Sequence, residues 1–345
     1  MNPSGLRRHK GTHIPEYCDE EYAMKILRAS ICVAITALAL SLPLGASSFA
    51  GDDEASVLTR QMKELYRAGK YKEALPLAQK SLALREKEFG PDDASVAMPL
   101  NDLGTIHYNL GQFAVAELLY KRSLAINEKT LGPEHTEVAS VLNNLGELYR
   151  SERRYAEAET ILKKSIAIRE KAGGRDDPSI VLALSNLAAV YSSQAQYEKA
   201  EPLFKRGLAL LEKALGPNDP EATVLMNNLA DAYIHRNRYA DAERLLKRAI
   251  AVTEKAFGPD HPDVAQGQNN LAALYARQGR DADAERLFRR SAAALEKTLG
   301  PNHPDLADVL QNLAGLYKHQ GRYADAEQAF KRSMAIRVKA GSGQI

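Results

Sequence analysis

One glycine recurs every 42 residues along most of this 345-residue chain, and the step never changes. The column comprises Gly90, Gly132, Gly174, Gly216, Gly258 and Gly300. An alanine column from Ala74 to Ala326 keeps the same step and divides residues 51–345 into seven units. A fixed period of this length indicates an array in which one small unit stacks on its own copies. We therefore expect an elongated repeat structure and not a single globular core.

Each unit is predicted to form two helices. Leu145, Leu148 and Tyr149 are three and four residues apart, which gives one apolar stripe on a first helix. A second stripe starts at Ala158, and the short linker "RSERRY" between the stripes requires an antiparallel pair. The recurring glycine can adopt the left-handed conformation that ends a helix, and Pro133 prevents the helix from continuing. These signals predict an all-α chain.

The stretch "NNLGELYRSERRYAEAETILKKSIAIREK" (residues 143–171) resembles a tetratricopeptide repeat, and the linker "GPDHPDVA" (residues 258–265) resembles the kinesin light chain type. The resemblance covers residues 51–345. It implies a right-handed α-solenoid of about seven helix-turn-helix repeats, with the first helices lining the concave face. Local departures are Gln61, His107 and Asp281, which replace a leucine, a tyrosine and a loop aromatic residue of the other units.

The N-terminal residues 24–50 have the pattern of a secretory signal peptide. Basic residues follow Met24, an apolar run extends to about Leu42, and small residues precede a cleavage point near Ala50. Residues 1–23 are polar, so either translation starts at Met24 or this segment is a tail on an uncleaved anchor. We expect a bacterial-type exported protein that is periplasmic or secreted. Both cysteines of the chain precede the predicted cut, so the mature protein contains no thiol.

The charge balance and the motifs exclude several functions. A formal charge of +2 argues against a chain-wide basic surface for nucleic acid or, after cleavage, for a membrane. The mature chain has no nucleophile elbow, phosphate loop or HExxH motif, so we predict no enzyme and no cofactor. His135, His261 and His303 alternate with aspartates in one column, which favours helix N-caps over a metal site. No metal is expected.

A glutamate column is also interpreted as structural. Each of Glu117, Glu159, Glu201, Glu243, Glu285 and Glu327 has a basic residue four positions later. Such a pair stabilises a helix by a few tenths of a kcal/mol, and a catalytic acid would not need six copies.

Amide side chains on the first helices are harder to explain by the scaffold alone. The residue before the conserved leucine is Asn144, Asn186, Asn228, Asn270 or Asn312, and Asn143, Asn227 and Asn269 come one position earlier. Asparagine is a mediocre helix former, so its retention suggests a use. Either these amides bridge neighbouring first helices, or they pair with the backbone of an extended peptide. The resemblance implies the second role for the five residues directly before the leucine.

Specificity is expected in the columns that vary between units. Arg150, Arg277 and Lys318 belong to such columns on the same side of the first helices. They either meet acidic side chains of a ligand or form a solvated surface. We count them, with the amides, as candidate peptide-binding residues.

The sequence therefore predicts an exported, non-enzymatic scaffold that binds an extended segment of a partner protein in its concave groove. The alternative is a structural component of cell-envelope assemblies that associates through its convex face or its last helix. Phe330, Met334 and Ile336 near the C-terminus have no further helix to cover them in this sequence, which predicts a stacking or homodimer surface.

Overall fold

The computed structural model describes residues 53–342, which form seven antiparallel helix pairs and contain no β-strand. The pairs are α2 (Glu54–Arg67) with α3 (Tyr71–Phe89), α4 (Ala94–Asn109) with α5 (Phe113–Leu131), α6 (Thr136–Ser151) with α7 (Tyr155–Gly173), α8 (Val181–Ser193) with α9 (Tyr197–Leu215), α10 (Ala222–His235) with α11 (Tyr239–Phe257), α12 (Pro262–Arg277) with α13 (Asp281–Leu299), and α14 (Pro304–His319) with α15 (Tyr323–Ser342). One 3₁₀ turn, η1 (Pro178–Ile180), precedes α8. The predicted signal peptide and both cysteines lie outside the described residues.

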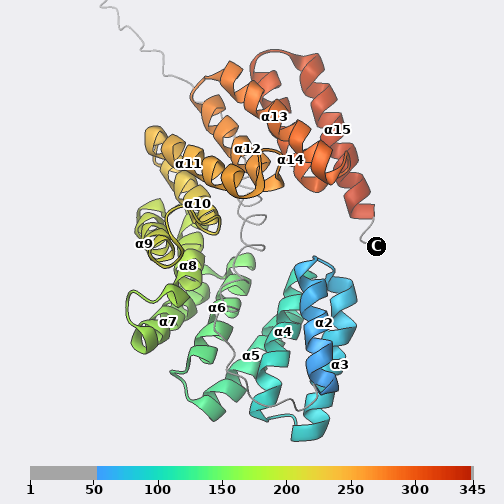
Figure 1. Cartoon of the computed structure of the whole chain (residues 1–345), viewed down its shortest axis with the longest axis vertical. Helices are drawn as coiled ribbons and strands as arrows, with labels where there is room; N and C mark the ends of the chain where they lie inside the picture. The colour runs from blue at the N-terminus through green and yellow to red at the C-terminus, as the bar shows by residue number, and fades with distance from the viewer. Residues whose placement is uncertain (1–52, 343–345) are drawn as a thin grey trace, which may run out of the picture.

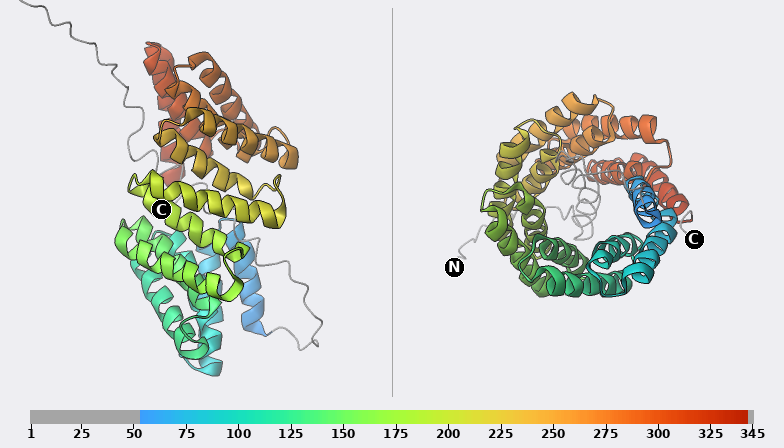
Figure 2. Two further views of the ribbon diagram at one scale, coloured as in Figure 1. Left: turned by 90° about the vertical axis from the view of Figure 1, so that its left-hand side faces the viewer. Right: turned by 60° about the horizontal axis from the view of Figure 1, so that its bottom comes forward.

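The pairs follow one another around a superhelix (Figures 1 and 2). The first helices contact each other from pair to pair, as α4 does with α6 and α12 with α14, whereas the second helices pack mainly against first helices. Closer spacing of the first helices places them on the inner side of the curve. The predicted all-α solenoid is confirmed, with the first helices on its concave face. None of the helices in residues 53–342 is long and apolar enough to cross a membrane.

The core is an extended cluster that runs through the stack from α5 to α15, with a second cluster under α2 to α5. One column of second-helix residues lies at its centre. Its members include Tyr120, Leu162, Phe204 and Phe288, each of which is at most 2% exposed. Burial of each large side chain stabilises the array by roughly 1.5–3 kcal/mol. Since each column residue is covered only when the next pair is in place, no pair is stable alone.

Glycine has two separate roles in the repeat. Gly146 permits close packing within a pair, because a methyl group added there would lie 2.5 Å from Cγ of the buried Leu162. Gly132, after α5, has φ 90° and ψ 156°. The expected left-handed cap is therefore wrong in detail: φ is positive, but ψ is extended, in a region that only glycine occupies readily. This geometry turns the chain directly toward the next first helix.

Charged residues join each pair to the next. Glu117 on α5 accepts hydrogen bonds from Tyr149 (3.0 Å) and Arg154 (2.9 Å) of the following pair, and the guanidinium of Arg154 lies 3.9 Å from the centre of the Tyr149 ring. The hydrogen bond from Arg154 contributes most to lowering the pKa of Glu117 to about 2. The predicted pair with Lys121 is present at 2.8 Å. The glutamate column thus holds neighbouring units together, a role that the sequence alone did not reveal.

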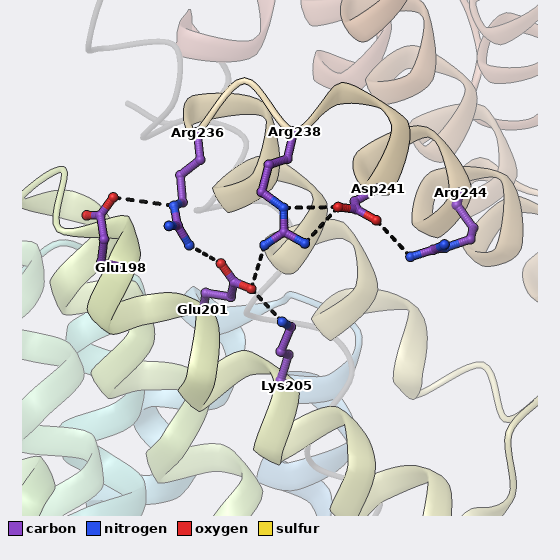
Figure 3. Close-up of polar contacts among 7 residues, drawn as sticks. All are labelled: Glu198, Glu201, Lys205, Arg236, Arg238, Asp241 and Arg244. Carbon is purple, nitrogen blue, oxygen red and sulfur yellow. Dashed lines mark hydrogen bonds and ion pairs between the residues drawn. The ribbon is translucent and has the colours of Figure 1, made fainter.

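The network of ion pairs around the equivalent glutamate on α9, Glu201, involves more residues (Figure 3). Lys205, Arg236 and Arg238 all contact its carboxylate, and Arg238 also binds Asp241 at 2.7 Å. Burial opposes ionisation of Glu201, but hydrogen bonds from Lys205 and Arg238 lower its pKa. A buried carboxylate surrounded by cations fixes the position of the α10–α11 pair on α9.

We expect opposite effects from two glycine-to-alanine substitutions in first helices. Gly146→Ala should destabilise the protein by about 1 kcal/mol or more, because the new methyl group collides with Leu162. Gly315→Ala, on α14, should stabilise it by about 0.5–1 kcal/mol, because the space at that position is open and alanine favours helix. Urea denaturation of both variants tests this, and equal shifts of the midpoint would contradict the close packing at Gly146.

Candidate interaction surface

The amide residues bridge successive first helices along the concave face. The side-chain amide of Asn144 donates to Oδ1 of Asn101 at 2.9 Å, and that of Asn186 donates to Oδ1 of Asn143 at 3.1 Å. A third contact of the same kind joins Asn312 to Asn269 at 2.9 Å. We call these three contacts the amide rungs. Three asparagines of the row therefore have a structural role, because their side chains fix the stacking of the repeats.

The rungs are absent on both sides of α10. Asn228 would need a partner at position 185, where a serine replaces the asparagine and is too short to reach. Its Nδ2 atom has no hydrogen-bond partner although the residue is only 5% exposed. Oδ1 of Asn227 is also unpaired, and Oδ1 of Asn270 accepts from Gln266 at 3.2 Å. A buried donor and a buried acceptor are therefore unused on adjacent residues of α10.

The three basic candidates occupy different environments. Arg150 is buried and its guanidinium forms two hydrogen bonds with Glu147, at 2.5 and 3.2 Å. Tyr108 of the preceding pair donates to the same carboxylate at 3.0 Å. Arg277 and Lys318 are exposed. Arg150 is thus already neutralised, whereas the other two are accessible to a ligand.

Two carboxylates on this face are less well compensated. Asp102 on α4 has its Oδ2 atom buried without a hydrogen bond, and Lys63 approaches only to 3.9 Å. Burial raises the pKa of Asp102 to about 6. Burial also raises the pKa of Asp231 on α10, whose Oδ1 atom lies 3.6 Å from Nε2 of His235. Neither residue is marked by a motif in the sequence, although both are acidic in columns that are mostly neutral.

The recurring histidines serve as helix caps. Nδ1 of His135, His261 and His303 accepts a hydrogen bond from the backbone N–H two residues later, at 3.2, 3.2 and 3.3 Å. Asp93 and Asp177 do the same in other units through their carboxylates. The capping interpretation is confirmed, and residues 53–342 contain no cluster of three or more potential metal ligands.

The last helix exposes part of an apolar face. Phe330 is 50% exposed and Met334 is 46% exposed, whereas the equivalent of Phe330 one unit earlier, Phe288, is 1% exposed. The expectation for Ile336 is wrong: it is 2% exposed. Six residues after Phe330, it lies roughly 120° around α15 from that residue and packs into the core.

Comparisons with known proteins agree with this architecture. A family model described as tetratricopeptide repeat matches residues 54–129, 119–171, 137–213, 220–297 and 263–337. No curated protein sequence matches the chain.

Solved structures extend the likeness. A putative kinesin light chain of Podosopora anserina with nearly identical TPR-like repeats is 26% identical, covers 60% of this chain and 98% of its own, and has a TM-score of 0.51. BtubC (BKLC) from P. vanneervenii is 20% identical over 70% of this chain and 92% of its own, with a TM-score of 0.55. The apo form of RapI is 15% identical, covers 84% of this chain and 99% of its own, and has a TM-score of 0.63. The last two show the fold alone.

The two kinds of asparagine should respond differently to alanine. Asn186→Ala leaves Oδ1 of the buried Asn143 without its donor, and we expect a loss of about 1–3 kcal/mol in the free energy of unfolding. Asn228→Ala removes a donor that has no partner, so stability should stay within about 0.5 kcal/mol or rise. Chemical denaturation compares them. Equal destabilisation would mean that the rungs do not contribute to stacking.

Proposed function

The chain belongs to the tetratricopeptide repeat family, and on this premise we propose that it is a non-enzymatic scaffold whose concave face binds an extended segment of a partner protein. Repeats of this family form protein–protein interaction scaffolds. The observation that carries the proposal is the gap in the amide rungs at α10. An extended main chain presents both a carbonyl and an N–H group, which suit the unused donor of Asn228 and the unused acceptor of Asn227.

The neighbouring helices support the same position for the ligand. α8 carries no charged residue along its whole length, and its partly exposed residues, such as Ser192, are neutral. Binding a main chain there requires little desolvation of charge. Arg277 and Lys318 lie further along on α12 and α14, where they are exposed to meet side chains of the bound segment.

We also infer that the protein acts outside the cytoplasm, in the periplasm or as a secreted protein. The apolar run and the small residues at positions 48–50 support this location. N-terminal sequencing of the exported protein should find a mature end near Gly51, and an intact N-terminus would favour the anchored form.

Obstruction of the concave face tests the binding mode. A tryptophan at Gly315 on α14 or at Ala273 on α12 should abolish capture of partner proteins. Both residues lie two positions after the recurring leucine of a first helix, in a column that varies between units, and Gly315 has open space around it. Ala240→Trp, at an exposed position on the outer helix α11, is the matched control and should leave capture unchanged. Thermal melting confirms that each variant is folded.

The same experiment separates this proposal from an assembly role through α15. The first pair exposes Glu54 and Gln61 where the next pair buries Val96 and Leu103, so the N-terminal end of the stack is polar and does not match the apolar face around Phe330. An assembly role would instead pair two such faces in a homodimer. Capture that persists with Gly315→Trp but is lost with Phe330→Glu would establish the assembly role and overturn binding on the concave face.

A further inference from the structure

Negative charge on the concave face is concentrated at two places. Asp102 on α4 and Asp231 on α10 accept no hydrogen bond from the described residues, and both carboxylates are partly enclosed, with 20% and 32% of the side chain exposed. A carboxylate in such a position lacks both full hydration and a close counter-ion. A cation delivered by a ligand would supply what each of them lacks.

The stretch between these two carboxylates is electrically neutral. Glu147 on α6 is already bound by Arg150 and Tyr108, and α8 has no charged residue. The carboxylates of this stretch that accept no hydrogen bond are therefore confined to the second and the fifth helix pair.

A second observation at α10 points to a ligand beside Asp231. Asn228 lies three residues before Asp231 and hence on the same side of the helix. Its Nδ2 donor is unpaired, and the residue as a whole is 5% exposed. The unpaired acceptor Oδ1 of Asn227 belongs to the adjacent residue. The carboxylate suits a cationic side chain of a ligand, and the amide donor one turn away suits the main-chain carbonyl of the same ligand residue.

The cations now near the two carboxylates do not block such a ligand. Lys63 is 46% exposed and remains 3.9 Å from Asp102, and Arg277 is exposed, so both can move into solvent at little cost. His235 is held in place by stacking on the ring of Tyr197, with centroids 4.5 Å apart and planes 4° from parallel. It approaches Asp231 to 3.6 Å without a hydrogen bond, and 32% of the Asp231 side chain remains exposed.

We propose that the concave face selects an extended protein segment with at least two separated basic residues, whose lysine or arginine side chains pair with Asp102 and Asp231. The proposal rests on the concave-face binding described above and specifies the chemistry of the partner. Asn228 then binds the main-chain carbonyl near the residue at Asp231.

Peptides of alternating residues provide the probe, because they offer a charge at every second residue along an extended chain. A lysine–alanine peptide should bind to the full-length mature protein in calorimetry, a glutamine–alanine peptide should bind at least about tenfold more weakly, and a glutamate–alanine peptide should not bind. Stronger binding of the glutamate peptide would overturn the proposal.

Charge-neutralising variants locate the interaction. Asp102→Asn and Asp231→Asn should each weaken binding of the lysine–alanine peptide by about threefold to tenfold. Both should melt no lower than the parent, because each replaces a carboxylate whose ionisation is disfavoured by burial. Asp92→Asn, at an exposed loop carboxylate, changes the net charge equally and should have no effect. An equal loss with Asp92→Asn would show non-specific attraction and overturn the proposal.

Failure of this proposal can be distinguished from failure of the proposed function. If Gly315→Trp abolishes partner capture while both aspartate variants bind the lysine peptide as the parent does, concave-face binding stands and the basic specificity is wrong. If Gly315→Trp and the aspartate variants all leave capture unchanged, both proposals fail.

Discussion

The structure depends on the way each helix pair covers the one before it. A second-helix residue such as Leu162 or Phe204 is fully enclosed only when the next pair is in place. The glutamate of the same helix then binds the tyrosine and arginine of that pair, so apolar burial and charge pairing act across one interface. Burial supplies most of the free energy, and the ionic contacts, which are strongly directional, fix the angle between units. The curvature of the whole array follows from this angle.

This arrangement divides the molecule into a structural and a variable surface. The ion pairs and the caps recur in most units and are internal to the stack. The concave face differs from unit to unit, with amide rungs at both ends, an interruption at α10, a neutral stretch on α8, and isolated carboxylates at Asp102 and Asp231. Variation on one face of a constant scaffold is what a binding surface requires, because recognition depends on differences that the fold does not need.

The asparagine row shows how one residue type serves both purposes. At three of the four places where an asparagine lies two positions before the leucine of the preceding unit, namely 101, 143 and 269, the following amide is used in stacking. At the fourth, Asn227, the side-chain oxygen stays unpaired. Where serine replaces the asparagine at position 185, the next amide in the row is left free. In the sequence, the two roles are alternatives. The contacts assign the first role to three members of the row and make Asn228 the member best suited to the second.

The repeat length, the helix pairs, the histidine caps and the ion pairs within helices could all be predicted from the sequence, since these depend on residues close together in the chain. The sequence also located the candidate face, because helical periodicity places the variable columns together. Only the folded chain shows that the glutamates join neighbouring units, that Tyr108 of one pair binds Glu147 of the next, that Ile336 is buried, and that neither Asp102 nor Asp231 accepts a hydrogen bond. The physical reason is that hydrogen bonding and desolvation depend on which atoms of different repeats meet, and a distance of 32 to 43 residues along the chain does not reveal this.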